Sequence, residues 1–91
     1  MLDLSVIILA RNEELHIRRC LENILPVVKE VFVIDCFSTD NTAAICREYP
    51  RVQVIQHEWP GLYALQFNWA LDNCPITAEW VLRLDADEWF M

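Results

Sequence analysis

Four short, mainly apolar runs constrain the fold of this chain more than any other feature. They cover residues Leu4–Ala10, Val31–Ile34, Val52–Ile55 and Trp80–Asp85. A strand that is covered on both faces of a sheet is apolar along most of its length, whereas a strand with one solvated face alternates between apolar and polar residues. The runs therefore predict buried strands of a parallel sheet.

The segments between these runs have helical rather than strand periodicity. The first is expected to begin after Asn12, acting as N-cap, and to end at Pro26; the second is capped by Asp40 or Ser38 and ends at Pro50. In the first, apolar residues recur at i, i+3, i+4, i+7 and i+8. The third, over Leu62 to Ala70, has a broader and less regular apolar face.

Strand and helix thus alternate along the whole chain. Such units form a parallel sheet with right-handed helical crossovers, which predicts an α/β protein with three layers (αβα) and a mostly parallel sheet. The order of the strands in the sheet is not encoded in this pattern. Trp59, Trp69 and Trp80 are assigned to the core.

Composition excludes several classes of protein. The net charge of −7 argues against binding to nucleic-acid backbone. The longest apolar run is too short to cross a membrane and does not have the pattern of a signal peptide, so we expect a cytoplasmic protein without a transmembrane segment. Four cysteines without a C-x-x-C pair favour reduced thiols over a zinc site or a disulfide framework.

The end of the chain suggests part of a longer protein. Trp89 and Phe90 are followed only by Met91, so nothing later in the sequence can cover them. We therefore expect a single unit over residues 1–91 that belongs to a larger parent. An uncovered aromatic end also predicts self-association.

Polar and acidic residues follow three of the four strands. Arg11 and Glu13 follow the first, Asp35 ends the second, and Asp85 and Asp87 end the fourth. In open α/β sheets, ligands bind outside the carboxyl ends of the strands, so these groups should converge on one edge. Asp85 and Asp87 would point to the same side of an extended backbone. Two such carboxylates repel each other unless a cation neutralises them, and Mg²⁺ or Mn²⁺ suits their oxygen atoms. The alternative is a solvated acidic turn.

Glycine-dependent nucleotide motifs are absent from the sequence. It has neither G-x-G-x-x-G nor G-x-x-x-x-G-K-[ST], which argues against dinucleotide and P-loop chemistry, and no G-x-S-x-G hydrolase elbow. A non-catalytic metal- or nucleotide-binding module and a nucleotidyltransferase remain as possible functions.

An ordered set of motifs resembles the N-terminal half of a family 2 glycosyltransferase. The set comprises Leu4–Ile8, Arg11–Glu14, Val33–Asp35, Ser38–Thr42 and Leu84–Glu88, and it spans nearly the whole chain. The variant present here is similar to transferases that build lipopolysaccharide core and capsule. The resemblance implies the GT-A fold, truncated before its acceptor half. It also implies inverting transfer from a nucleotide-diphosphate sugar, expected to be a UDP-sugar, to a hydroxyl of a saccharide or lipid-linked acceptor. The parent would work at the inner face of the membrane.

The resemblance also implies roles for individual residues. Ala10, Arg11 and Glu13 would line the nucleotide, and Asp35 would accept a hydrogen bond from the base. Gln66 and Asn68 lie on a segment that reaches the donor. Asp85 and Asp87 would hold the metal ion, with Asp85 also near the ribose. The catalytic base lies downstream in the family, so this chain is expected to lack it and to be inactive alone. Cys36 and Phe37 replace the acid and glycine that usually follow Asp35.

Overall fold

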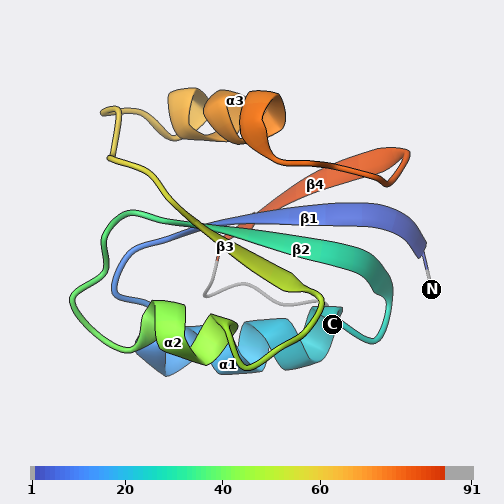
Figure 1. Ribbon diagram of the computed structural model, residues 1–91, viewed down its shortest axis with the longest axis horizontal. Helices are drawn as coiled ribbons and strands as arrows, with labels where there is room; N and C mark the ends of the chain where they lie inside the picture. Colours follow the sequence, from blue (N-terminus) through green and yellow to red (C-terminus); the bar gives the residue numbers. More distant parts are fainter. Residues whose placement is uncertain (1, 86–91) are drawn as a thin grey trace.

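The chain forms a four-stranded, fully parallel sheet between two layers of helices. The computed structural model describes residues 2–85. The strands are β1 (Leu2–Ala10), β2 (Val28–Asp35), β3 (Val52–Gln56) and β4 (Trp80–Asp85), arranged in the order β3-β2-β1-β4. Helices α1 (Glu14–Ile24) and α2 (Thr42–Cys46) cover one face, and α3 (Tyr63–Asn73) covers the other (Figure 1). The predicted three-layer α/β architecture is confirmed.

The central strand β1 is buried on both faces. Val6, Ile8 and Ala10 belong to the core beneath α1 and α2, whereas Ile7 and Leu9 belong to the core beneath α3. A strand covered on both sides needs apolar residues at consecutive positions, which explains the uninterrupted run in the sequence.

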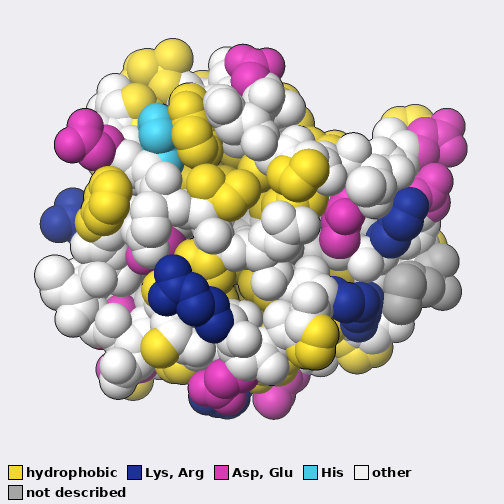
Figure 2. Space-filling view, in the orientation of Figure 1, with side chains coloured by type: hydrophobic (Ala, Val, Ile, Leu, Met, Phe, Trp, Pro, Cys, Tyr) yellow, Lys and Arg dark blue, Asp and Glu magenta, His cyan; other side chains and the backbone are white. Residues whose placement is uncertain are grey.

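The two helical layers are unequal. Helix α1 buries Ile17, Cys20, Leu21 and Ile24 against the sheet, as its periodicity predicts. Helix α3 buries only Gln66 and Ala70. Leu62, Leu65 and Leu71 remain exposed in this layer, and Figure 2 shows hydrophobic side chains on the surface over α3. The irregular apolar face of α3 in the sequence is reflected in this thinner packing.

Two of the three tryptophans assigned to the core are exposed. Trp59 is 41% exposed and Trp80 is 67% exposed, so the prediction was wrong for both. Trp80 begins β4, an edge strand within the described part of the sheet, and Trp59 lies in the loop after β3. Trp69 does pack against the core beneath α3.

Two helix boundaries also differ from the prediction. Asn12 is not the N-cap of α1, because its φ of 53° is left-handed and the helix begins only at Glu14. Helix α2 ends at Cys46 rather than continuing to Pro50. Strand β2 begins at Val28, before the apolar run from which it was predicted.

The remaining predictions about the chain as a whole have different outcomes. All four cysteines are free and buried. Between residues 2 and 85, no helix is long and apolar enough to cross a membrane. Asp87, Trp89 and Phe90 lie outside the described residues, so the predicted self-association stays a prediction.

Two leucines on α1 test the packing of this layer. Leu21 is fully buried, whereas Leu15 is 88% exposed. We expect Leu21→Ala to lower the free energy of unfolding by about 2–5 kcal/mol, because it leaves a cavity in the core. Leu15→Ala should change it by less than about 0.5 kcal/mol. Urea denaturation followed by circular dichroism measures both; equal effects would contradict this packing.

Candidate functional site

The strand order places a crevice at the carboxyl end of β1. The chain leaves β1 toward β2 and β3 on one side and returns to β4 on the other. Such a reversal of strand order is where open α/β sheets bind ligands. The register brings the strand ends level, because Leu9 pairs with Asp85 and Ala10 pairs with Asp35.

A cavity of about 350 Å³ lies at this edge. Its lining includes the residues predicted to contact nucleotide from three separate segments: Ala10, Arg11 and Glu13 after β1, Gln66 on α3, and Asp85 at the end of β4. Leu9, Ile34, Cys36, Trp59 and Tyr63 supply the rest of the wall. The predicted convergence on one edge is therefore visible in the structure for these residues.

Two of the residues predicted to contact the nucleotide or donor, Asp35 and Asn68, do not line this cavity. Asp35 is fully buried. Asn68 is exposed, although it lies only two residues from Gln66 on α3. Residues two apart on a helix do not share a face, so Gln66 and Asn68 cannot both point to the cavity.

The charged groups of the cavity wall are two carboxylates and one guanidinium. Glu13 and Asp85 are half-buried, and Arg11 is exposed. Carboxylates that share a partly desolvated space favour a bound cation. Within residues 2–85 no three metal-ligating side chains cluster. Asp87, the second predicted metal ligand, lies outside that range, so the metal site stays a prediction.

The turn after β1 and the loop after β2 are tied together by backbone amides and side chains. The amide of Asn12 donates to Ser38 Oγ at 2.8 Å, and the amide of Thr39 donates to Asn12 Oδ1 at 2.8 Å. Asparagine tolerates a left-handed backbone better than most residues, which allows this reciprocal contact. Arg11 and Glu13 flank Asn12, so this contact fixes the position of their backbone in the cavity wall.

The starts of α1 and α2 bond each other in the same way. The amides of Glu13 and Glu14 donate to Thr42 Oγ1 at 2.9 Å and to Asp40 Oδ2 at 3.1 Å. In return, the amide of Asn41 donates to Glu14 Oε1 at 3.2 Å. The first amides of a helix have no partner within the helix, and here the neighbouring loop supplies one. Asp40 also accepts from the amide of Thr42, the first residue of α2, but the N-cap of this helix is Asn41 and not the predicted Asp40 or Ser38.

Asp35 lies beneath this edge and is fully buried. Its carboxylate accepts from the amide and hydroxyl of Ser38 and from Gln56 Nε2, the last at 2.8 Å. Ser38 therefore binds Asp35 rather than capping α2. The carboxylate holds the loop after β2 to the end of β3. Contact between Asp35 and a nucleobase stays a prediction.

Gln66 is positioned by a histidine that the sequence analysis did not assign to the site. His57 Nδ1 donates to Gln66 Oε1 at 2.6 Å, and its ring stacks on Trp69 with centroids 3.7 Å apart. Gln66 is almost fully buried yet lines the cavity. Because its oxygen is engaged by His57, its Nε2 is the group available to a ligand. The only sequence signal for His57 was its place at the start of the loop after β3.

The parallel sheet with an acidic cavity at the reversal of strand order defines an α/β ligand-binding domain. Comparison with known proteins gives the family: residues 5–91 match the model of Glycosyl transferase family 2, and the chain belongs to this family.

Relatives and solved structures agree with that assignment. The lipopolysaccharide core biosynthesis glycosyltransferase LpsC of Rhizobium meliloti is 35% identical over 96% of this chain and 32% of its own length. Glycosyltransferase SunS of Bacillus subtilis is 30% identical over 88% of this chain and 19% of its own. The chain thus spans about a third or less of these relatives.

Two crystal structures share the fold. TarS of S. aureus (residues 1–349) superposes with a TM-score of 0.79 at 29% identity, covering 98% of this chain and 28% of that TarS chain. Glucosyl-3-phosphoglycerate synthase of Mycobacterium tuberculosis, solved with Mn²⁺, UDP and glucosyl-3-phosphoglycerate, has a TM-score of 0.70 at 23% identity. That match covers 91% of this chain and 33% of the synthase. The GT-A fold implied by the motifs is thereby confirmed.

Thr42 tests the contact between the two helix starts. Thr42→Val removes the acceptor of the Glu13 amide at a fully buried position, so we expect a loss of about 1–3 kcal/mol in the free energy of unfolding. Thr42→Ser keeps the hydroxyl and should retain most of the stability. Thr39→Val is the control in urea denaturation, because it loses only a long 3.4 Å hydrogen bond from its hydroxyl to Asn12 Oδ1 at an exposed position. Identical midpoints for Thr42→Val and Thr39→Val would show that the contact contributes nothing.

Acid titration tests Asp40. Partial burial raises the pKa of this carboxyl, but hydrogen bonds from the hydroxyl and amide of Thr42 and the amide of Glu14 outweigh it, so the pKa lies below its ordinary 3.8. Stability from the ionised group is complete above the ordinary pKa and is lost as pH falls through the lower folded value. Asp40→Asn should therefore lose less stability than wild type between about pH 5 and pH 2. Urea midpoints across this range measure it, with Asp72→Asn as the exposed control; parallel curves for wild type and Asp40→Asn would contradict the expectation.

Proposed function

We propose that residues 1–91 form the donor-binding half of a glycosyltransferase domain. The parent protein transfers a sugar from a nucleotide-diphosphate donor, expected to be a UDP-sugar, to an acceptor hydroxyl. The observation that carries this proposal is the cavity at the end of β1, where Glu13, Asp85 and Arg11 meet in a chain of this family.

The cavity wall suits a diphosphate that is bound together with a cation. Arg11 is the single positive residue of the wall within residues 2–85, while Glu13 and Asp85 are negative. An anionic ligand alone would meet net repulsion here. A divalent cation that binds together with the ligand removes this repulsion, because Mg²⁺ typically uses one or two carboxylates together with substrate phosphates.

The residues present fit Mg²⁺ or Mn²⁺, with Asp85 and Asp87 as the proposed ligands. When bound, the metal supplies Lewis-acid stabilisation of the charge that develops on the departing diphosphate. The solved synthase from Mycobacterium tuberculosis contains Mn²⁺ and UDP together, which supports the same pairing here.

The chain's own residues orient the donor. Arg11 offers hydrogen-bond donors to the phosphates, and the carboxylate of Glu13 offers acceptors to hydroxyl groups of the donor. Ala10 lines the same wall, with its carbonyl bonded to the amide of Cys36. Gln66 Nε2, with its orientation set by His57, adds a directed donor from the opposite wall. These groups position the donor for displacement, which is the main contribution that a binding half can make.

The acceptor is proposed to be a saccharide or lipid-linked saccharide of the cell envelope, supported by the similarity to LpsC. Inversion at the transferred sugar requires a base beside the acceptor hydroxyl. Within residues 2–85, the acidic side chains of the cavity wall are Glu13 and Asp85, both already used for the donor. We therefore propose that the catalytic base lies in the acceptor half of the parent protein. The parent is proposed to act at the inner face of the membrane.

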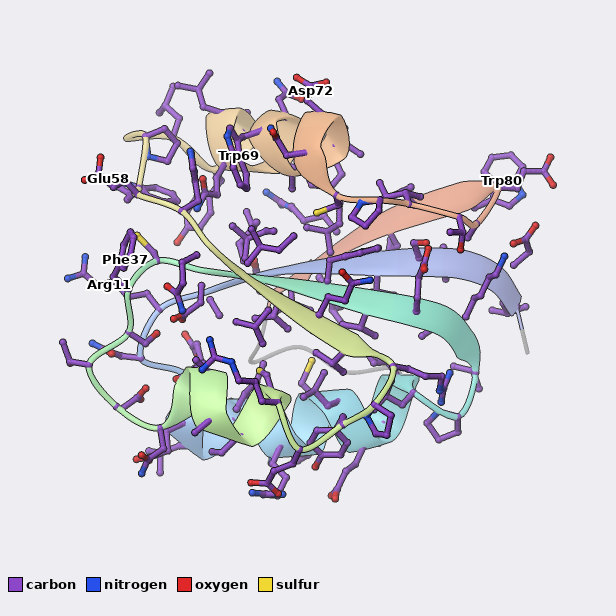
Figure 3. The ribbon with its side chains drawn as sticks, viewed as in Figure 1. Arg11, Phe37, Glu58, Trp69, Asp72 and Trp80 are labelled. Carbon is purple, nitrogen blue, oxygen red and sulfur yellow. The ribbon has the colours of Figure 1, made fainter. Side chains whose placement is uncertain are left out.

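Asp85→Asn tests the donor site. Isothermal titration of the chain with UDP and Mn²⁺ should show binding that Asp85→Asn weakens at least about tenfold, because a charged ligand of the metal is lost. Asp72→Asn removes the same charge from an exposed position on α3, far from the cavity (Figure 3), and should leave affinity unchanged.

Two results would refute the donor site. One is equal affinity of wild type and Asp85→Asn for UDP with Mn²⁺. The other is binding of UDP that does not depend on Mn²⁺ or Mg²⁺. A nucleotidyltransferase would instead bind a nucleoside triphosphate far more tightly than UDP in the same titration.

A further inference from the structure

His57 and Gln66 form a polar pair that links the end of β3 to α3. His57 Nδ1 and Gln66 Oε1 are 2.6 Å apart, and Gln66 is almost fully buried in the wall of the cavity. The pairing uses one end of the Gln66 carboxamide, so the other end is presented to the cavity. Which end is presented depends on the histidine, because a neutral imidazole has one nitrogen that donates a hydrogen bond and one that accepts it.

The ring of His57 is held in place by contacts that do not involve its nitrogens. The ring stacks on Trp69 of α3 with centroids 3.7 Å apart and planes at 17° (Figure 3). The backbone amide of His57 donates to the carbonyl of Asp35 at 3.1 Å. Gln66 and Trp69 are three residues apart and are therefore neighbours on the surface of the helix. The position of the ring is thus fixed, whereas the residue is half-buried and its ring can exchange protons with solvent.

The protonation state of His57 decides how the Gln66 carboxamide is oriented. In the imidazolium form both ring nitrogens are donors, so Nδ1 must bond Gln66 Oε1, and the amino group of Gln66 faces the cavity. In the neutral form, Nδ1 is either the donor or the acceptor. Where it is the acceptor, the carboxamide turns over, its amino group bonds Nδ1, and Oε1 faces the cavity. The charged histidine therefore allows one polarity of the cavity wall, and the neutral histidine allows two.

We propose that His57 is a positioning residue that makes donor binding depend on pH through the orientation of Gln66. The proposal rests on the function proposed above. The oxygen atoms of an ionised diphosphate accept hydrogen bonds, so the donor binds the state in which Gln66 presents its amino group. A rise in pH through the titration of His57 populates the turned-over state and also removes a positive charge beside the cavity. Both changes lower the affinity for an anionic donor.

The charged groups around this pair keep their charge over the same range of pH. The side chains that α3 presents to the ring, Gln66 and Trp69, are neutral. Glu58, next to His57 in the loop, is exposed at the edge of the molecule (Figure 3), and the Asp35 carboxylate is buried and accepts hydrogen bonds from its own loop and from β3. The charged groups that share the cavity wall with Gln66 are Arg11, Glu13 and Asp85. Carboxyl and guanidinium groups ordinarily do not titrate between about pH 5.5 and about pH 7.5, whereas an imidazole does.

Isothermal titration with UDP and Mn²⁺ between about pH 5.5 and about pH 7.5 tests the proposal. The terminal phosphate of UDP also titrates, at about pH 6, so each wild-type affinity is divided by that of a variant whose residue 57 does not titrate. His57→Asn is this variant, because its amide N–H can donate to Gln66 Oε1 at every pH. We expect the ratio to fall by about 2- to 10-fold with rising pH, as when half to nine-tenths of the neutral form is turned over.

Two further variants separate positioning from charge and from stability. Gln66→Met keeps the charge of His57 but has no carboxamide, so adding His57→Asn to it should no longer change the pH dependence. His57→Phe keeps a ring that can stack on Trp69 but cannot bond Gln66, so it should bind UDP more weakly than His57→Asn at an equal melting temperature. His16→Asn, which removes the other histidine of the chain, should show the pH dependence of wild type.

Nitrogen-15 NMR of wild type gives a readout that does not depend on any variant. With saturating UDP and Mg²⁺ at about pH 7.5, His57 Nδ1 should carry a proton, because only then does Gln66 present its amino group. An unprotonated Nδ1 in this complex would overturn the proposal, even if every variant of His57 failed to fold.

The outcomes separate this proposal from the proposed function. If wild type and His57→Asn bind UDP with the same pH dependence, the positioning proposal is wrong and the donor site stands. If the pH dependence survives unchanged in Gln66→Met, the charge of His57 acts without Gln66 and the positioning proposal is again wrong. If wild type binds no UDP with Mn²⁺ at any pH, the donor site is wrong and the role of His57 falls with it.

Discussion

The candidate site depends on hydrogen bonds between two loops, the one after β1 and the one after β2. Backbone amides of each loop donate to side chains of the other. Asn12, Glu13 and Glu14 donate to Ser38, Thr42 and Asp40, and Thr39 and Asn41 donate back to Asn12 and Glu14. Neither helix start is capped by its own N-cap side chain. The two loops must therefore fold against each other, and the cavity wall forms with them. The hydrogen bonds of Asn12 and Glu13 in this set also fix the backbone on which Arg11 and Glu13 lie.

Much of the fold was predictable because a strand that is buried on both faces of a sheet has apolar residues at consecutive positions. The run at β1 is apolar at consecutive positions since Ile7 and Ile8 face opposite cores. The polar residues that follow three of the four runs mark the carboxyl edge, and all carboxyl edges of a parallel sheet coincide. The convergence of Arg11, Glu13 and Asp85 followed from this rule without knowledge of the strand order.

What escaped prediction depends on contacts between segments far apart in sequence. Asn12 has the same local preference for an N-cap as for a left-handed turn, and only Ser38 and Thr39 decide between the two. Strand order also depends on contacts between distant segments. An apolar run indicates that a strand is buried, but not which strands lie next to it. Trp80 was assigned to the core from its hydrophobicity, although the side chain at the start of an edge strand has few residues to cover it. His57 had no ligand pattern in the sequence, and its role appears only through Gln66 and Trp69.

Asp35 could contact the nucleotide base or hold its own loop in place, and its burial bears on which of these roles it has. The family resemblance assigns it to the base, yet its carboxylate is fully buried and is engaged by Ser38 and Gln56. A base could reach it only by displacing one of these partners. Displacing Gln56 would also release the amide of Phe37, because Gln56 bonds both. In this conformation, Asp35 therefore holds the backbone of the loop after β2, through Ser38 and through Gln56.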